Sequence, residues 1–132
     1  MDQEKKKQEQ NDRKTILNDV FKEMDRQSSL WGQQNHEPIV WCGILGEEVG
    51  QVNKAAIESH FMDKDLLEYR NDCVRVAAVA MSMLLCLNRK EREAHRKEAY
   101  RVHQEIANEI RNQRIELGHA IPNTKSDKRN EK

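Results

Sequence analysis

The sequence predicts an all-α fold in which four helices form a single domain. Apolar residues recur every three or four positions along most of the 132-residue chain, and this is the spacing of one helix face. Charged residues make up 35% of the chain and aromatic residues 5%, with 5 Gly and 2 Pro, a composition that favours long solvated helices over a sheet. A chain of this length supports one core, so we assign a helical domain to residues 15–118.

The N-terminal residues 1–14 are polar and charged, and we expect them to be disordered or to form a frayed first turn. The first amphipathic helix is predicted from Thr15 to about Gln27. Its apolar face consists of Ile16, Leu17, Val20, Phe21 and Met24. Ser28 and Ser29 mark its end.

A second helix is predicted from Pro38 to about His60, because proline suits the first turn, where no backbone N–H is needed. Inside it lie Gly43, Gly46 and Gly50. Each glycine costs about 1 kcal/mol of helix stability relative to alanine. Their cluster therefore indicates either close helix packing or the approach of a ligand to the backbone.

A third helix is predicted from Asp63, as N-cap, to about Leu87, and its apolar second half, VAAVAMSMLLCL, is expected to be the most buried part of the fold. A fourth helix is predicted from Arg89 to Leu117. Its narrow apolar stripe, which is typical of a coiled-coil seam, consists of Ala99, Val102, Ile106, Ile110 and Leu117. We therefore expect a homodimer or homotetramer built through the third and fourth helices, followed by a disordered tail at residues 119–132.

The charge balance argues against several classes of partner. The formal net charge is zero, so no concentrated basic surface predicts a nucleic-acid polymer or a membrane as partner. No apolar run is expected to be long enough to cross a bilayer. Cys42, Cys73 and Cys86 lie in apolar runs and are interpreted as buried thiols in a reducing compartment. These observations favour a cytoplasmic protein.

Two carboxylates interrupt faces that are otherwise apolar. In the second helix Glu48 shares a face with Ile44 and Val52, and in the third helix Asp72 shares one with Val76. Burying an ionised carboxylate is costly unless a cation, a metal or hydrogen-bond donors compensate it. Two such faces in one small chain indicate a functional site.

Three separated motifs between Arg26 and Arg89 occur in an informative order: RQSSLWGQQNH, then W-x-x-IL-x-EEVG, then a VAAVA helix that ends in CLNR. In these motifs, which span about half of the chain, the sequence resembles the MazG-like nucleotide pyrophosphohydrolases of the all-α NTP pyrophosphatase superfamily, particularly the small phage-type members. The resemblance implies an oligomeric helical bundle that splits a nucleoside triphosphate into a monophosphate and pyrophosphate.

The resemblance also implies a Mg²⁺ site, possible with Mn²⁺ as well, held by carboxylates on two facing helices. Its first motif, EExxE, falls on Glu47, Glu48 and Gln51, and its second falls on Asp72 and Arg75. The acids Glu47, Glu48 and Asp72 would be catalytic and hold the metal with help from Gln51. The chain departs from the pattern at Gln51 and Arg75, and a guanidinium cannot coordinate a cation. Glu68, one turn before Asp72, is a candidate replacement ligand.

The candidate substrate-binding residues lie in and around these motifs. They are Trp31, Gln34, His36, Lys54 and Arg75. Trp31 and His36 would stack on a nucleobase, as the resemblance suggests, and Trp41 would belong to the core; the alternative is that both tryptophans cap the core. Arg75 would contact phosphate, and Lys54 would either reach phosphate or be an ordinary exposed lysine.

Two alternatives stay open. In the first, Arg75 pairs with Glu48 and Asp72 in place of the metal, which leaves a noncatalytic module that binds a nucleotide or a protein. In the second, the chain is a structural helical adaptor, Glu47 and Glu48 lie on a solvated helix face, and Asp72 and Arg75 form an ordinary ion pair.

Overall fold

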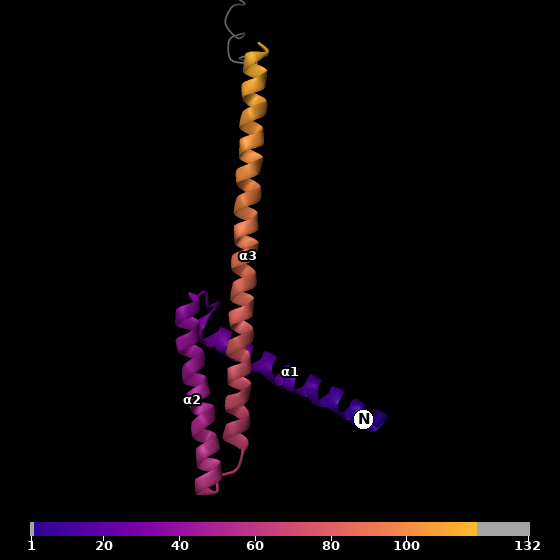
Figure 1. Ribbon diagram of the computed structural model, residues 1–132, viewed down its shortest axis with the longest axis vertical. Helices are drawn as coiled ribbons and strands as arrows, with labels where there is room; N and C mark the ends of the chain where they lie inside the picture. The colour runs from indigo at the N-terminus through magenta and orange to yellow at the C-terminus, as the bar shows by residue number, and fades with distance from the viewer. Residues whose placement is uncertain (1, 119–132) are drawn as a thin grey trace, which may run out of the picture. The chain divides into compact units, whose positions relative to one another are not determined.

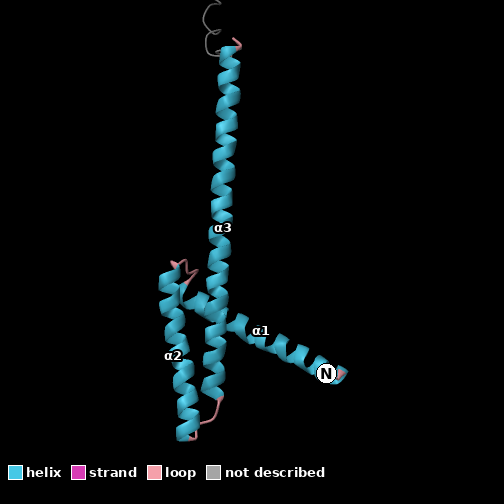
Figure 2. Ribbon diagram, in the orientation of Figure 1, coloured by secondary structure: helices cyan, strands magenta, loops and turns pink. Residues whose placement is uncertain are grey.

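The computed structural model describes residues 2–118, and within them the chain is entirely helical apart from short connections (Figure 2). The helices are α1 (Gln3–Trp31), α2 (Pro38–Met62) and α3 (Leu67–Glu116). The all-α prediction is confirmed, although the described residues form three helices where four were expected. The predicted C-terminal tail, 119–132, lies outside the described residues.

α1 begins twelve residues earlier than predicted, so the expectation of a disordered segment at 3–14 was wrong. The Asp2 side chain accepts a hydrogen bond from the Glu4 backbone N–H at 3.4 Å, which caps the helix. Glu9 and Arg13 then form an i, i+4 ion pair, and the neighbouring Gln, Glu and Lys residues have high helix propensity. Local propensity and side-chain pairs therefore extend the helix where no apolar face exists.

α1 also ends one turn later than predicted, because the two serines do not stop it. The Ser29 hydroxyl donates to the Asp25 carbonyl at 2.9 Å, which keeps Ser29 within the helix. The helix ends at Gly32, whose φ of 70° suits glycine and whose N–H donates to the Ser28 carbonyl at 2.8 Å.

α2 starts at Pro38 as predicted and ends at Met62, two residues beyond the predicted end. Asp63 was expected to be the N-cap of the following helix, but it adopts the left-handed conformation (φ 58°) that terminates α2. The Asp65 carboxylate accepts from the Leu67 N–H at 3.1 Å instead and caps α3.

The break predicted between Leu87 and Arg89 is absent, because α3 runs without interruption through Asn88 for 50 residues. No Gly or Pro lies within α3, and strong helix formers follow Asn88. A change from an apolar to a charged composition was thus misread as a helix boundary.

The described residues divide into two units, the first ending at Lys90 and the second beginning at Glu91. In the first, α2 and the start of α3 run antiparallel side by side, and the end of α1 crosses them (Figure 1). Its core joins Trp41, Val79 and Cys86, with Ile44, Leu45 and Met83 packed around them. Leu84 is 61% exposed, so the apolar half of the predicted third helix is only partly buried.

The expectation of three buried thiols was right for Cys86 alone. Cys42 is exposed and Cys73 is half-buried, and all three thiols are free.

The expectation that no apolar run could span a bilayer was wrong by length and composition. α3 contains an 18-residue window with a mean hydropathy of 1.2, of which 22% is buried. Core helices of soluble proteins meet the same criterion, so this window alone is weak support for a membrane span.

Candidate functional site

The first unit brings together charged side chains from all three helices. We call this group, Glu23 of α1, Glu48 of α2, and Asp72 and Arg75 of α3, the acidic site. Asp72 is 5% exposed and is the one charged residue that is buried in the described part of the chain. Arg75 Nη1 donates to Asp72 Oδ1 at 2.8 Å. The buried carboxylate is therefore compensated by a residue of its own helix.

The electrostatics of Glu48 show that these groups act on one another. Burial raises the pKa of the Glu48 carboxyl, and the neighbouring acids Glu47, Asp72 and Glu23 raise it further. Arg75 opposes them by lowering the same pKa. The Arg75 guanidinium therefore interacts electrostatically with carboxylates on two helices, Glu48 of α2 and Asp72 of α3.

Sequence reasoning missed Glu23 and Arg26, which α1 contributes. The Glu23 side chain is 13% exposed, and Arg26 Nη2 lies 2.6 Å from Glu23 Oε1. The hydrogen bond from Arg26 lowers the pKa of Glu23, partly against the effect of burial. A signal existed, because Glu23 lies three residues after the buried Val20 and therefore shares its helix face.

The structure does not gather all of the predicted metal ligands around a common point. Glu47, Gln51 and Glu68 are exposed, and Glu68 lines a cavity with Ala55, Glu58, Lys64 and Asp65. Among residues 2–118, no three His, Cys, Asp or Glu side chains are grouped so that they could hold a metal ion. Within the acidic site, Asp72 is paired with Arg75 and Glu23 with Arg26, whereas Glu48 makes no ion pair with a described residue.

A groove lies between α1 and α3 beside the acidic site and has a volume of about 350 Å³. Four of its lining residues are cationic, namely Lys22, Arg26, Arg70 and Arg75, and two are acidic, namely Asp19 and Glu23. Arg70 Nη2 contacts Asp19 Oδ2 at 2.7 Å. The groove thus offers several guanidinium groups, each with N–H donors beyond those used in its ion pair.

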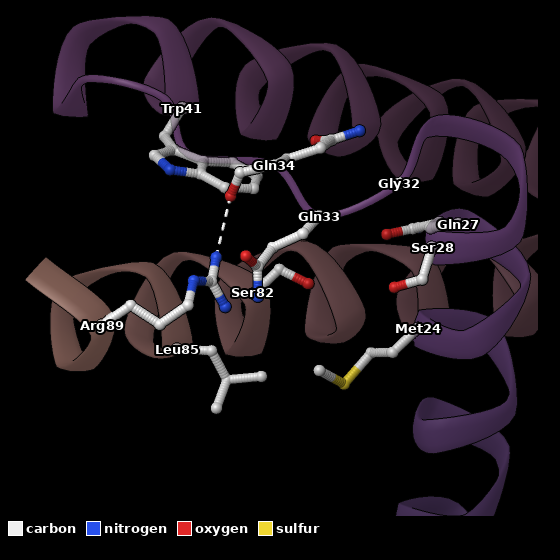
Figure 3. Close-up of a pocket in the computed structure, with 10 residues that line it drawn as sticks. All are labelled: Met24, Gln27, Ser28, Gly32, Gln33, Gln34, Trp41, Ser82, Leu85 and Arg89. Atoms are coloured by element: carbon white, nitrogen blue, oxygen red, sulfur yellow. Dashed lines mark hydrogen bonds between the residues drawn. The ribbon is translucent and has the colours of Figure 1, made fainter.

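A second cavity, the connector pocket, lies where the α1–α2 connection meets α3 and has a volume of about 210 Å³ (Figure 3). Its lining is polar but mostly uncharged, with three glutamines, two serines and the aromatic ring of Trp41. The full set is Met24, Gln27, Ser28, Gly32, Gln33, Gln34, Trp41, Ser82, Leu85 and Arg89.

Arg89 and Trp41 define the connector pocket chemically. Arg89 reaches from α3 to the connection, where Nη2 donates to the Gln34 carbonyl at 2.9 Å and Nε to Asn35 Oδ1 at 3.0 Å (Figure 3). Trp41 is 4% exposed, and its buried Nε1 has no hydrogen-bond partner among residues 2–118.

The predicted substrate-binding residues lie in different environments in the structure. Gln34 lines the connector pocket, and the His36 ring packs edge-on against Trp41 with 5.0 Å between ring centroids. Trp31 is 59% exposed and lines neither the groove nor the connector pocket. Lys54 is exposed beside Glu58, at 4.0 Å. The expectation that Trp41 belongs to the core is confirmed.

Comparisons with protein-family models, with curated proteins and with solved structures found no match to this chain.

Proposed function

We propose that this chain is a nucleotide-binding module in which Arg75 supplies positive charge at the place of a metal. The observation that carries the proposal is the 2.8 Å contact between the Arg75 guanidinium and the buried Asp72 carboxylate. Arginine stays protonated in proteins and has no lone pair to offer a cation. Its pairing with Asp72 therefore satisfies that carboxylate without a bound ion.

The surroundings supply the two chemistries that a nucleotide needs. The groove presents Lys22, Arg26 and Arg70 beside Arg75, and guanidinium groups bind phosphate oxygens in a bidentate manner. The connector pocket offers amide and hydroxyl groups and the Trp41 ring, which suit a planar base with donors and acceptors. Both cavities take residues from the last turns of α1, with Glu23 and Arg26 in the groove and Met24 and Gln27 in the pocket.

A second candidate, the Mg²⁺-dependent pyrophosphohydrolase implied by the MazG-like motifs, is favoured by a different observation. The pKa of Glu48 is raised by burial and by three neighbouring acids, and a divalent cation would relieve this crowding. In this candidate Glu47, Glu48 and Asp72 would hold the ion, and Arg75 would turn toward the substrate phosphates. Among the ion pairs of the described residues, Arg75 contacts Asp72 and not Glu48, which leaves Glu48 free for this role.

One experiment separates the candidates. Binding of nucleoside triphosphates is measured by titration calorimetry, and pyrophosphate release is assayed in parallel with Mg²⁺ or Mn²⁺. Wild type is compared with Glu48→Ala, Arg75→Gln and the control Arg13→Gln, which loses an exposed ion pair on α1.

The binding module predicts nucleotide binding without release, lost in Arg75→Gln and retained in Arg13→Gln. Pyrophosphate release that depends on the metal and is abolished by Glu48→Ala would contradict the binding module and support the pyrophosphohydrolase. If neither binding nor release occurs, the chain is a structural adaptor.

A further inference from the structure

The second unit exposes an apolar face on the last turns of α3. Val102 is 39% exposed, Ile106 51% and Ile110 48%, and no other described element belongs to this unit. Three pairs of positions along the face are eleven residues apart: Ala99 and Ile110, Val102 and Gln113, Ile106 and Leu117. An eleven-residue period is typical of helices that pair along a nearly straight or right-handed seam.

Charges on either side of this face are separated by sign. At 3.6 residues per turn, one flank carries only acids, namely Glu91, Glu98, Glu105, Glu109 and Glu116. The opposite flank carries only basic residues among its ionisable positions, namely Arg96, His103 and Arg114. Arg92 lies five full turns before Ile110 and therefore falls on the seam face itself. Arg101 lies further round the helix, on the side away from the seam, and pairs with Glu98 and Glu105 of its own helix.

The separation of acidic and basic residues onto opposite flanks bears on which partner this face takes and on whether the two helices run parallel or antiparallel. In two parallel helices related by a twofold axis, the acidic flank of one faces the basic flank of the other, whereas antiparallel helices place like flanks together. Like charges opposed along a seam are destabilising. We propose that residues 91–117 pair in parallel and in register with the same segment of a second copy of this chain.

The register follows from the spacing of the flanking charges. Where the seam positions are three and then four residues apart, as at 99–102–106 and 110–113–117, the residue just before the first position lies beside the partner residue just after the second, five positions further along the chain. Glu109 then faces Arg114 of the second copy, and Glu98 faces His103 of the second copy. Gln113 lies within the seam opposite its own counterpart, where two amides can hydrogen-bond and hold the register. This proposal is independent of the nucleotide site, since it uses no residue of the first unit.

The first test places a thiol in the seam of the full chain. Gln113→Cys is oxidised under mild conditions, and the linked peptides are mapped so that the three native cysteines are distinguished. A parallel, in-register pair brings the two introduced thiols together and gives a covalent dimer linked at position 113. The matched control is Asn108→Cys, whose position on the same helix faces away from the seam, and it should give no link at 108.

The second test measures the dissociation constant by sedimentation equilibrium. Glu109→Arg should raise it roughly two- to tenfold, as expected for two symmetry-related surface ion pairs, and adding Arg114→Glu should restore it. A wild-type chain that stays monomeric at micromolar concentration would overturn the proposal. It would also be overturned if Gln113→Cys crosslinked only to a chain carrying Ala99→Cys, because that result identifies an antiparallel pair.

Discussion

Arg75 Nη1 lies 2.8 Å from Asp72 Oδ1, one helical turn away on α3, and the Asp72 side chain is 7% exposed while that of Arg75 is 40% exposed. Arg75 therefore links a buried carboxylate to the solvent-accessible groove between α1 and α3. The same guanidinium lowers the pKa of both Glu48 and Glu23, so replacing Arg75 with a neutral residue should raise the pKa of acids on two other helices.

Loss of Arg75 should destabilise the fold more than loss of an exposed arginine. Arg75→Gln leaves Asp72 buried without its ionic partner, and we expect the free energy of unfolding to fall by about 1–3 kcal/mol. Arg13→Gln breaks the exposed pair with Glu9 and should cost less than about 1 kcal/mol. Urea denaturation of both variants measures the loss in free energy of unfolding. Equal losses would show that the Asp72–Arg75 pair stabilises the fold no more than an exposed ion pair does.

Replacing Glu48 should change the pH dependence of stability in a defined direction. The folded-state pKa of Glu48 is raised above its ordinary value of 4.5, so folding favours the protonated form, and the ionised form is destabilising once the pH exceeds the folded pKa. Glu48→Gln should therefore stabilise the protein at pH 7. The gain should shrink toward zero as the pH falls to 4, where the carboxyl is mostly protonated in both folded and unfolded chains.

Thermal unfolding of wild type and Glu48→Gln across this pH range measures the difference. A gain that persists unchanged at pH 4 would assign the effect to packing and not to charge.

Two α2 glycines should be replaceable with a gain in stability. A Cβ built on Gly43 or Gly50 meets nothing within 4 Å, so close packing within the described chain does not explain either residue. Each change to alanine should raise the free energy of unfolding by about 1 kcal/mol. Gly32→Ala is the opposite control, because its φ of 70° disfavours a side chain. Destabilisation by Gly43→Ala, measured by urea denaturation, would reveal a ligand or second copy against α2.

Trp41→Phe should separate stability from ligand binding. The Trp41 N–H has no hydrogen-bond partner in the described part of the chain, so removing it breaks no hydrogen bond there, and repacking around the smaller ring should cost less than about 1.5 kcal/mol. If the connector pocket holds the base, the variant should bind nucleotide several-fold more weakly by calorimetry. Unchanged affinity would remove Trp41 and its pocket from the nucleotide site.

The burial of Asp72 and the partial burial of Glu48 could be predicted from the sequence, because each carboxylate interrupts an apolar stripe with helical periodicity. A carboxylate or a tryptophan in an apolar stripe must lie against another helix, whichever helix that is. The participation of Glu23 depended on how α1 crosses the other two helices, and a single chain's periodicity does not report that crossing. The continuity of α3 was missed for another reason: Asn88 separates two compositions, but a helix ends only where a residue or a cap stops it.

The two tryptophans of this chain occupy opposite environments, since Trp41 is 4% exposed within the core and Trp31 is 59% exposed at the end of α1. A soluble quencher such as iodide reaches only exposed indoles, so the emission of the protein divides into an accessible and a protected part. The protected part reports on the packing of α2 against α3, and the accessible part reports on the end of α1. The protein therefore carries its own two-site optical probe, and unfolding and ligand binding in the first unit can each be followed without an added label.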